Sequence, residues 1–237
     1  MEFGNLTNKE GVIVKKNLLP LMVIVCCFAK EVRVRASEKP SVEHVFTNIY
    51  EKGLWWTGET NSGCGSSLYN TQLIRQEIPR IIKQYGVESL LDIPCGDFNW
   101  MKFVDLGIDY IGADIVGSLI NENKRMHQGE KRTFVQLNII TDWLPKADLI
   151  LCRDCLVHLS IAQIWQTLRN IKRSGCKYLL TTCYSETQTN SDISAGSWRT
   201  INLTKEPFNF PMPLLSVNEG YEGDKCLMMW KIEDLPC

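Results

Sequence analysis

The chain has 237 residues, of which 44% are hydrophobic and 22% are charged, and its formal net charge is -1. This is an ordinary globular balance, and the chain is long enough for one core of α/β size. The near-zero net charge gives no indication of electrostatic binding to nucleic acid, which depends on counterion release, or of a strongly acidic partner.

An uncharged, mostly apolar run from Asn17 to Ala29 follows two lysines near the amino terminus. A membrane span needs about 20 residues, so the run fits the apolar part of a signal peptide better than a full span. A signal or anchor, an element packed on the domain, and a dispensable extension all stay open. We assign residues 1–40 to this extension and residues 41–237 to one domain. We favour the cytoplasm for the domain and expect membrane contact only through the extension.

Helical patterns come first in the domain. We expect a helix over residues 42–50, followed by a loop rich in Gly, Ser and Thr. Ser66 or Ser67 can cap a second helix, which Gly86 is placed to end. Pro79 lies inside this second helix and predicts a kink or a break.

Apolar runs then alternate with helical patterns. The clearest helix follows Ser160, which forms a capping box with Gln163, and Gly175 ends it. Strands alternating with helices predict crossover connections and a parallel sheet. The runs that read as strands lie at 88–93, 109–116, 133–139, 147–153 and 177–183.

The end of the chain differs from this alternation. Two runs, at 211–219 and 225–232, are joined by a Gly-rich turn with no room for a helix. They predict an antiparallel hairpin at the sheet edge. The predicted fold class is therefore α/β, with a Rossmann-like, open, mostly parallel sheet of seven strands, helices on both faces and a C-terminal antiparallel hairpin.

Acidic residues follow the first two strands, where open α/β sheets bind ligands. The stretch D-I-P-C-G-D runs from Asp92 to Asp97, and Asp114 lies 22 residues beyond Asp92. A carboxylate at the end of a second strand can accept hydrogen bonds from both ribose hydroxyls. A dinucleotide site needs G-x-G-x-x-G, whereas this turn has one glycine and two acids that would repel a pyrophosphate. A cationic nucleoside without phosphate, such as S-adenosylmethionine (SAM), avoids that repulsion.

Over about residues 88–232 the chain resembles class I SAM-dependent methyltransferases, whose first motif reads D/E-x-G-x-G-x-G. Asp92 matches the acid and Gly96 the second glycine, whereas Pro94 and Phe98 replace the first and third glycines. The resemblance implies that the cofactor is SAM and that the turn lies near its methionine part. The turn residues in this prediction are Asp92, Pro94, Cys95, Gly96 and Asp97, with capping of a helix at Phe98 as the alternative role of Asp97.

The resemblance also assigns the rest of the cofactor site. It implies that Asp114, next to Ile115, binds the ribose hydroxyls. It implies that Asn138 and Ile139 flank the adenine, and that Cys152 or Arg153 lends backbone contacts after the fourth strand.

The catalytic candidates are Asp154 and His158, which follow the fourth strand. Methyl transfer draws much of its acceleration from positioning and desolvation, and a base is needed only if the acceptor loses a proton early. The pKa of an ordinary histidine suits such a base. The apolar context of His158 equally fits a structural histidine, and Arg153 can pair with Asp154.

A long polar loop before the terminal hairpin is the candidate acceptor region, because long loops in compact domains tend to be functional. It is rich in hydroxyl and amide groups, and Tyr184, Trp198 and Arg199 are its predicted substrate contacts. Such a surface suits a sugar, but also a peptide or a base. We expect a small-molecule or glycan acceptor and no nucleic acid. A further hypothesis is that the earlier loop, with Trp55 and Ser62, folds over the cofactor.

Two rival functions and one chemical alternative stay open. The rivals are an NAD-dependent oxidoreductase and a non-catalytic binding protein on the same fold. The alternative concerns Cys152 and Cys155, the one C-x-x-C pair among ten cysteines. No second pair follows at zinc-finger spacing, so we expect buried thiols and no metal, with a redox or metal pair as the alternative.

Overall fold

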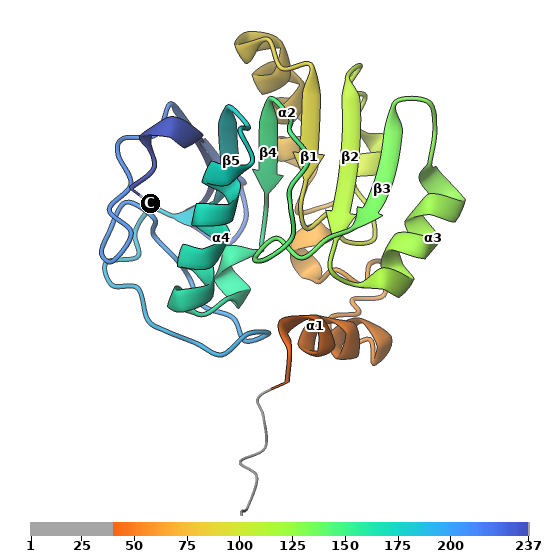
Figure 1. The fold of residues 1–237 in the computed structure, drawn as a ribbon, viewed down its shortest axis with the longest axis horizontal. Helices are drawn as coiled ribbons and strands as arrows, with labels where there is room; N and C mark the ends of the chain where they lie inside the picture. Colours follow the sequence, from red (N-terminus) through yellow and green to blue (C-terminus); the bar gives the residue numbers. More distant parts are fainter. Residues whose placement is uncertain (1–39, 237) are drawn as a thin grey trace, which may run out of the picture. The chain divides into compact units, whose positions relative to one another are not determined.

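Seven strands form one sheet in the order β3-β2-β1-β4-β5-β7-β6 in the computed structural model (Figure 1). Strands β1 to β5 pair in parallel, and β7 lies antiparallel between β5 and the edge strand β6. The predicted fold class and hairpin are thus confirmed. The strands are β1 (Ser89–Asp92), β2 (Asp109–Asp114), β3 (Arg132–Gln136), β4 (Leu149–Cys152), β5 (Tyr178–Tyr184), β6 (Leu215–Asn218) and β7 (Lys225–Lys231).

The structure describes residues 40–236, so the predicted extension lies outside the described residues except for Pro40. Within this described part, no helix is both long and apolar enough to cross a membrane. The helices are α1 (Val42–Glu51), α2 (Gln72–Tyr85), α3 (Gly117–His127) and α4 (Ile161–Arg173).

Two apolar clusters lie on the two faces of the sheet, because successive strand residues point to opposite sides. Leu91 belongs to the cluster packed against α4, and its neighbour Leu90 belongs to the cluster packed against α2 and α3. Helices α4 and α2 accordingly lie in front of and behind the sheet in Figure 1. Both faces are therefore covered, and functional side chains must gather at the strand ends.

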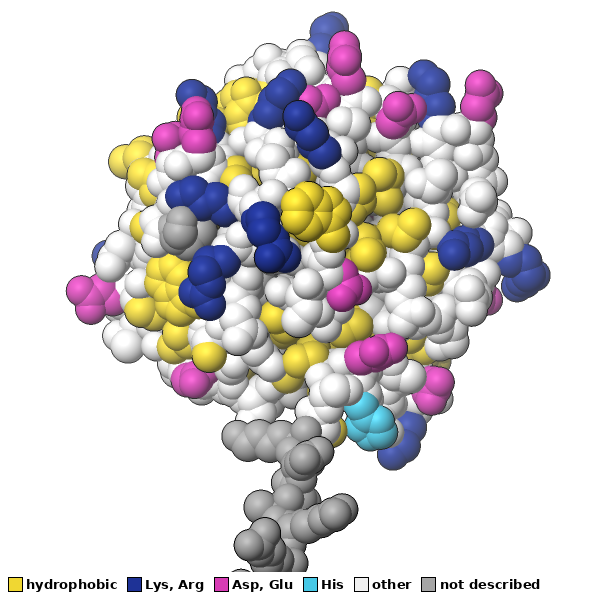
Figure 2. Space-filling view, viewed as in Figure 1, with side chains coloured by type: hydrophobic (Ala, Val, Ile, Leu, Met, Phe, Trp, Pro, Cys, Tyr) yellow, Lys and Arg dark blue, Asp and Glu magenta, His cyan; other side chains and the backbone are white. Residues whose placement is uncertain are grey.

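Helix α4 begins and ends as its sequence predicts. Ser160 accepts a hydrogen bond from the Gln163 backbone N–H, and the Gln163 side chain accepts one from the Ser160 backbone N–H. On its solvent side, the Arg173 guanidinium lies 5.6 Å above the ring of Trp143, which is 69% exposed. Figure 2 shows Lys and Arg side chains gathered around exposed hydrophobic side chains on this face.

The start of α2 differs from the prediction. The helix begins at Gln72, with Thr71 in the N-cap position, so the expected capping by Ser66 or Ser67 is wrong. Ser67 instead accepts a hydrogen bond from the Asn70 backbone N–H within the preceding turn. The predicted break at Pro79 is also wrong, because the helix runs through it to its left-handed end at Gly86. The isoleucines around Pro79 are buried, and their packing holds the helix together.

Candidate functional site

A cavity opens at the carboxyl ends of β1, β2 and β4, where α1 crosses below the strands in Figure 1. Phe46 and Tyr50 of α1 form one of its walls, and Trp55 and Ser62 of the following loop also line it. Most of the residues predicted from sequence line this one cavity, namely Asp92, Pro94, Cys95, Gly96, Asp114, Ile115, Asn138, Ile139, Arg153, Asp154 and His158.

Two buried carboxyl groups stand at the ends of β1 and β2. Asp92 accepts a hydrogen bond of 2.7 Å from the Tyr110 hydroxyl. Asp114 accepts hydrogen bonds from the backbone N–H groups of Gly96 and Val116. Burial raises the pKa of Asp92 to about 7 and that of Asp114 to about 6, because it disfavours the charged form. Both groups are therefore poised to bind a cation or a hydroxyl donor that stabilises the carboxylate.

In the turn after β1, Phe98 occupies a position where the D/E-x-G-x-G-x-G motif carries glycine. Phe98 has a φ of 57°, a left-handed conformation that few bulky residues adopt. Its ring packs edge-on against Phe134 at a centroid distance of 5.1 Å, and Arg132 lies 5.2 Å from it. This packing holds the backbone in the conformation that glycine would otherwise supply. No α-helix begins at Phe98, so Asp97 does not cap one. The segment between β1 and β2 instead contains a short 3₁₀ helix, Met101–Phe103.

Asp97 has another role in the structure, and it does not line the cavity. Its carboxylate accepts hydrogen bonds from the Thr60 and Ser62 hydroxyls and from the Asn61 backbone N–H. A Cβ at Gly96 would meet the Ser62 Oγ at 2.5 Å, so the single glycine of the turn makes room for this loop. Asp97 thus binds the loop through hydrogen bonds, and Gly96 leaves the space that the loop needs to pack against the turn.

The side of the cavity beyond β3 carries Asn138 and Ile139. The Asn138 side-chain oxygen accepts a hydrogen bond from the Ile140 backbone N–H. Ile139 is buried. A polar amide beside an apolar side chain is the kind of surface on which a heteroaromatic base can lie.

His158 stands on the opposite side of the cavity. Its Nδ1 lies 2.8 Å from the Ser197 carbonyl oxygen. A carbonyl only accepts hydrogen bonds, so the proton sits on Nδ1 and the neutral ring keeps a lone pair on Nε2. Burial lowers the His158 pKa, against the opposing effect of the Ser197 carbonyl. The ring packs on Trp55 at a centroid distance of 4.6 Å.

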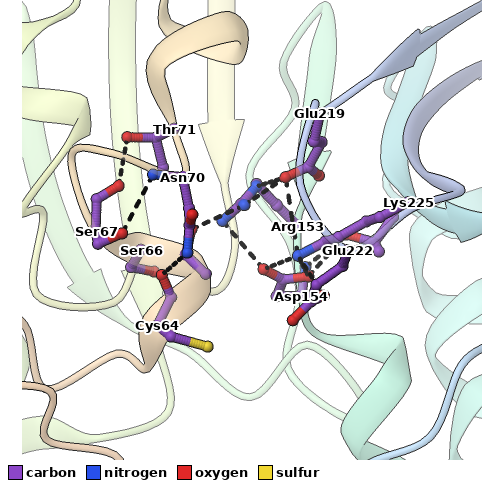
Figure 3. A network of polar contacts seen from close by, with 12 residues as sticks. Cys64, Ser66, Ser67, Asn70, Thr71, Arg153, Asp154, Glu219, Glu222 and Lys225 are labelled. Carbon is purple, nitrogen blue, oxygen red and sulfur yellow. Dashed lines mark hydrogen bonds and ion pairs between the residues drawn. The ribbon is translucent and has the colours of Figure 1, made fainter.

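Beside His158, Asp154 belongs to a buried network of charges (Figure 3). Arg153 Nη1 lies 3.1 Å from one Asp154 oxygen, and Lys225 Nζ lies 2.8 Å from the carboxylate. Burial by itself would raise the Asp154 pKa, but the Arg153 and Lys225 charges lower it to about 2. Asp154 is therefore a fixed anion and a weak base, whereas His158 is neutral with a free nitrogen.

The network reaches well beyond the end of β4. Arg153 also donates to Glu219 and to the Gly65 carbonyl, which joins the turn after β6 to the loop before α2. Glu219 and Lys225 are each 2% exposed. Sequence reasoning missed both residues, which stand where the two apolar runs of the hairpin meet its charged, Gly-rich turn.

The three predicted substrate residues lie outside the cavity lining. Arg199 donates to the backbone carbonyls of Ser191, Leu156 and Leu159, so its guanidinium anchors the long loop. Tyr184 is buried and Trp198 is 54% exposed, and their rings meet edge-on at 6.1 Å.

Cys152 and Cys155 are buried free thiols at the end of β4. A hydrogen bond with the Cys152 sulfur, together with burial, keeps the Cys155 pKa well above its usual range, so this thiol stays protonated. Cys152 lies outside the cavity lining, whereas Cys155 is part of it. In the described part of the chain, no group of His, Cys, Asp and Glu side chains is arranged to hold a metal ion.

Comparison with known proteins gives matches only at the level of structure. No family model matches the chain, and no curated protein sequence matches it. The magnesium protoporphyrin IX methyltransferase ChlM of Synechocystis PCC 6803, solved with bound SAM, aligns at a TM-score of 0.53 and 11% identity. The alignment covers 82% of this chain and 98% of that chain.

Two further solved structures align similarly. The PH0226 protein of Pyrococcus horikoshii OT3 has a TM-score of 0.53 and 13% identity, over 76% of this chain and 98% of that one. PigF, solved with S-adenosylhomocysteine (SAH), has a TM-score of 0.50 and 15% identity, over 67% of this chain and 54% of that one. The chain therefore has the class I methyltransferase fold.

Proposed function

We propose that the protein is a SAM-dependent methyltransferase that methylates a hydroxyl group of a small molecule or glycan. One observation carries the proposal: two buried carboxyl groups, Asp92 and Asp114, face one cavity at the ends of β1 and β2. Carboxylates there suit a cationic nucleoside and repel a pyrophosphate. The class I methyltransferase fold supports the same ligand.

The residues of the cavity fit the parts of SAM. Asp114 accepts hydrogen bonds from the ribose hydroxyls, Asp92 and Gly96 lie near the methionine part, and Asn138 with Ile139 holds the adenine. Pro94, Cys95, Ile115 and Arg153 complete the lining. Bound SAM supplies an electrophilic methyl group on a positively charged sulfur.

His158 takes the proton of the acceptor hydroxyl at Nε2. Its Nδ1–H is held by the Ser197 carbonyl, which fixes the ring and leaves Nε2 as the acceptor. Asp154 stays ionised between Arg153 and Lys225 and stabilises the imidazolium that forms, because it contributes a favourable charge to His158. General base catalysis of this kind is worth about 10²–10⁴-fold in rate.

The ribose assignment is tested with Asp114→Ala. Loss of the carboxylate should weaken SAH binding by more than about tenfold, which corresponds to about 1.4 kcal/mol, while the circular dichroism spectrum is unchanged. Asp109→Ala is the matched control, because Asp109 opens the same strand and is exposed. Unchanged affinity in Asp114→Ala would show that the ribose lies elsewhere.

A further inference from the structure

Four side chains at the end of β6, in the turn and at the start of β7 lie at the buried charge network, namely Glu219, Tyr221, Glu222 and Lys225. Figure 3 labels three of them, Glu219, Glu222 and Lys225. Lys225 Nζ lies 2.8 Å from Asp154 and also donates to the Tyr221 hydroxyl. Glu222 stands at the outer edge of the turn, and its side chain is 37% exposed. The inner residues of the turn are thus committed to the buried network, whereas Glu222 reaches solvent.

This turn continues into the wall that holds His158. Glu222 accepts a hydrogen bond of 2.8 Å from the Tyr184 hydroxyl, and the buried Tyr184 ring supports the ring of Trp198 edge-on. Trp198 directly follows Ser197, whose carbonyl fixes His158. Contacts through Tyr184 join Glu222 to Trp198, and the Ser197 carbonyl joins the same loop to His158. His158 lines the cavity, whereas Glu222 and Trp198 are more exposed residues outside its lining.

The charges around these residues favour an uncharged acceptor. Asp154 and Glu219 are already paired with Arg153 and Lys225 at 3.1 Å or less. A cationic acceptor would have to compete with these buried cations for Asp154 and Glu219, and Glu222 already lies 3.8 Å from Lys225 Nζ. An anionic acceptor would meet Asp154 and Glu222, which are both partly exposed. A neutral ligand meets neither cost.

The exposed groups suit a ring with both an apolar face and hydroxyls. A half-exposed indole such as Trp198 offers a flat apolar surface and an N–H donor. A carboxylate such as Glu222 accepts hydrogen bonds from hydroxyls, with Tyr184 holding it in place. A pyranose presents C–H groups on its faces and hydroxyls at its edge, so it can use both at once.

We infer that Trp198 and Glu222 form an acceptor subsite for a neutral, polyhydroxylated ring such as a pyranose, one hydroxyl of which is presented to His158. The inference rests on the proposed methyltransferase function. In the reaction, the hydroxyl oxygen forms a bond to the methyl carbon, the carbon–sulfur bond breaks with its electron pair going to sulfur, and the hydroxyl proton goes to His158 Nε2. SAM thereby becomes neutral SAH, and the products are a methyl ether and an imidazolium.

The test measures transfer of a tritiated methyl group from SAM by the full chain to three sets of hydroxyl compounds. The neutral set contains the methyl α-pyranosides of glucose, galactose and mannose, the cationic probe is tyramine, and the anionic probe is 4-hydroxybenzoate. We expect transfer to at least one pyranoside and to neither charged probe. Calorimetry with SAH on the same preparation reports separately whether the cofactor site is intact.

Two variants then locate the subsite. Trp198→Ala and Glu222→Gln should each raise KM for the pyranoside about tenfold with a smaller change in kcat, and leave the SAH Kd within about twofold. Trp143→Ala and Glu233→Gln are the matched controls, because both side chains are exposed at other surfaces, at 69% and 73%. The controls should leave all constants unchanged.

Each failure has its own meaning. If SAH does not bind, the proposed methyltransferase function is wrong, and the inferred acceptor subsite is wrong as well. If SAH binds but no pyranoside is methylated, or only a charged probe is, the subsite inference is overturned while the cofactor assignment stands. Equal KM values in wild type, Trp198→Ala and Glu222→Gln would also overturn it.

Discussion

The two sides of the cavity are constructed differently. On the side that we propose binds the cofactor, called the cofactor side, Asp92 and Asp114 stand directly at the ends of neighbouring strands, and the register of β1 and β2 brings them together. On the side that we propose binds the acceptor, called the acceptor side, Asp154 is held by Arg153 from its own turn and by Lys225, which lies 71 residues later in β7. The first side depends on local strand ends, whereas the second depends on a buried network joined only by the tertiary fold.

Because of this difference, substitutions on the two sides should affect different properties of the protein. A change at a cofactor carboxyl removes a ligand contact but leaves the strands paired. A change within the buried network leaves charges without partners in a low-dielectric environment, so it should affect folding as well as function. Measurements of stability and of ligand binding separate these two kinds of effect.

The largest expected effect is on stability. Arg153→Met should lower the free energy of unfolding by about 3–5 kcal/mol, because it leaves the buried Glu219 and the partly buried Asp154 without their main cation. The other carboxylate oxygen of Glu219 has no hydrogen-bond partner among the described residues, and the next cation, Lys225 Nζ, lies 3.8 Å from Glu219, farther than the lost guanidinium. Urea unfolding followed by circular dichroism measures the change.

Lys177→Met is the control for this prediction. Lys177 forms an ion pair with Asp148 at 2.6 Å, but its side chain is 64% exposed, so the loss should be within experimental error. Equal stability of Arg153→Met and wild type would mean that the network contributes nothing net to folding, and that the contrast between the two sides is mistaken.

The next effect is on the rate. His158→Asn keeps a polar side chain but removes the base, and kcat for the methylated acceptor should fall by about 10²-fold or more. The pH dependence of kcat should lose its rise at the low-pH limb, since the ionising base has gone. SAH affinity should change little. A fall in kcat with an unaltered pH profile would assign His158 a structural role.

A smaller effect should appear in the pH dependence of SAM binding. The Asp92 and Asp114 pKa values, about 7 and about 6, lie above the usual value near 4. A cationic ligand favours the carboxylates, so affinity should rise with pH between about 5.5 and 7.5, by up to about tenfold per unit where one carboxyl must ionise. Calorimetry in buffers of different ionisation enthalpy should detect proton release; proton uptake would contradict it.

The same pKa shifts determine how the stability of the free protein changes with pH. Between about pH 4 and pH 7 the folded state holds more protons on Asp92 and Asp114 than the unfolded state does. The contribution of these two groups to stability is therefore full below about pH 4 and declines as pH rises toward 7. Bound SAM should flatten this decline, which thermal unfolding with and without ligand can show.

The position of Asp92 and Asp114 at one cavity was predictable because it depends on local sequence. The apolar runs and their acidic ends identify β1 and β2, and parallel pairing brings Asp92 and Asp114 to one edge. The left-handed conformation of Phe98 was not predictable, since it depends on packing against Phe134 from another strand. The hydrogen bonds of Asp97 were also not predictable, because its partners lie far away in sequence, in the loop at Thr60–Ser62.

The acceptor side could be predicted only in part. Asp154 and His158 follow a strand and were identified from that position. Glu219 and Lys225 reach Arg153 and Asp154 because the terminal hairpin pairs with β5 over a long sequence distance, which no sequence spacing indicates. Arg199 was predicted to meet the substrate, but the structure shows its guanidinium bound to backbone carbonyls, which depends on how the long loop folds.

The central claim is that the cavity is built for a cationic nucleoside without phosphate. The most direct measurement is calorimetric titration of the purified full chain with SAH and, in parallel, with NAD. We expect saturable binding of SAH with one site per chain and no detectable heat of binding with NAD. Binding of NAD without SAH, or of neither ligand, would contradict it.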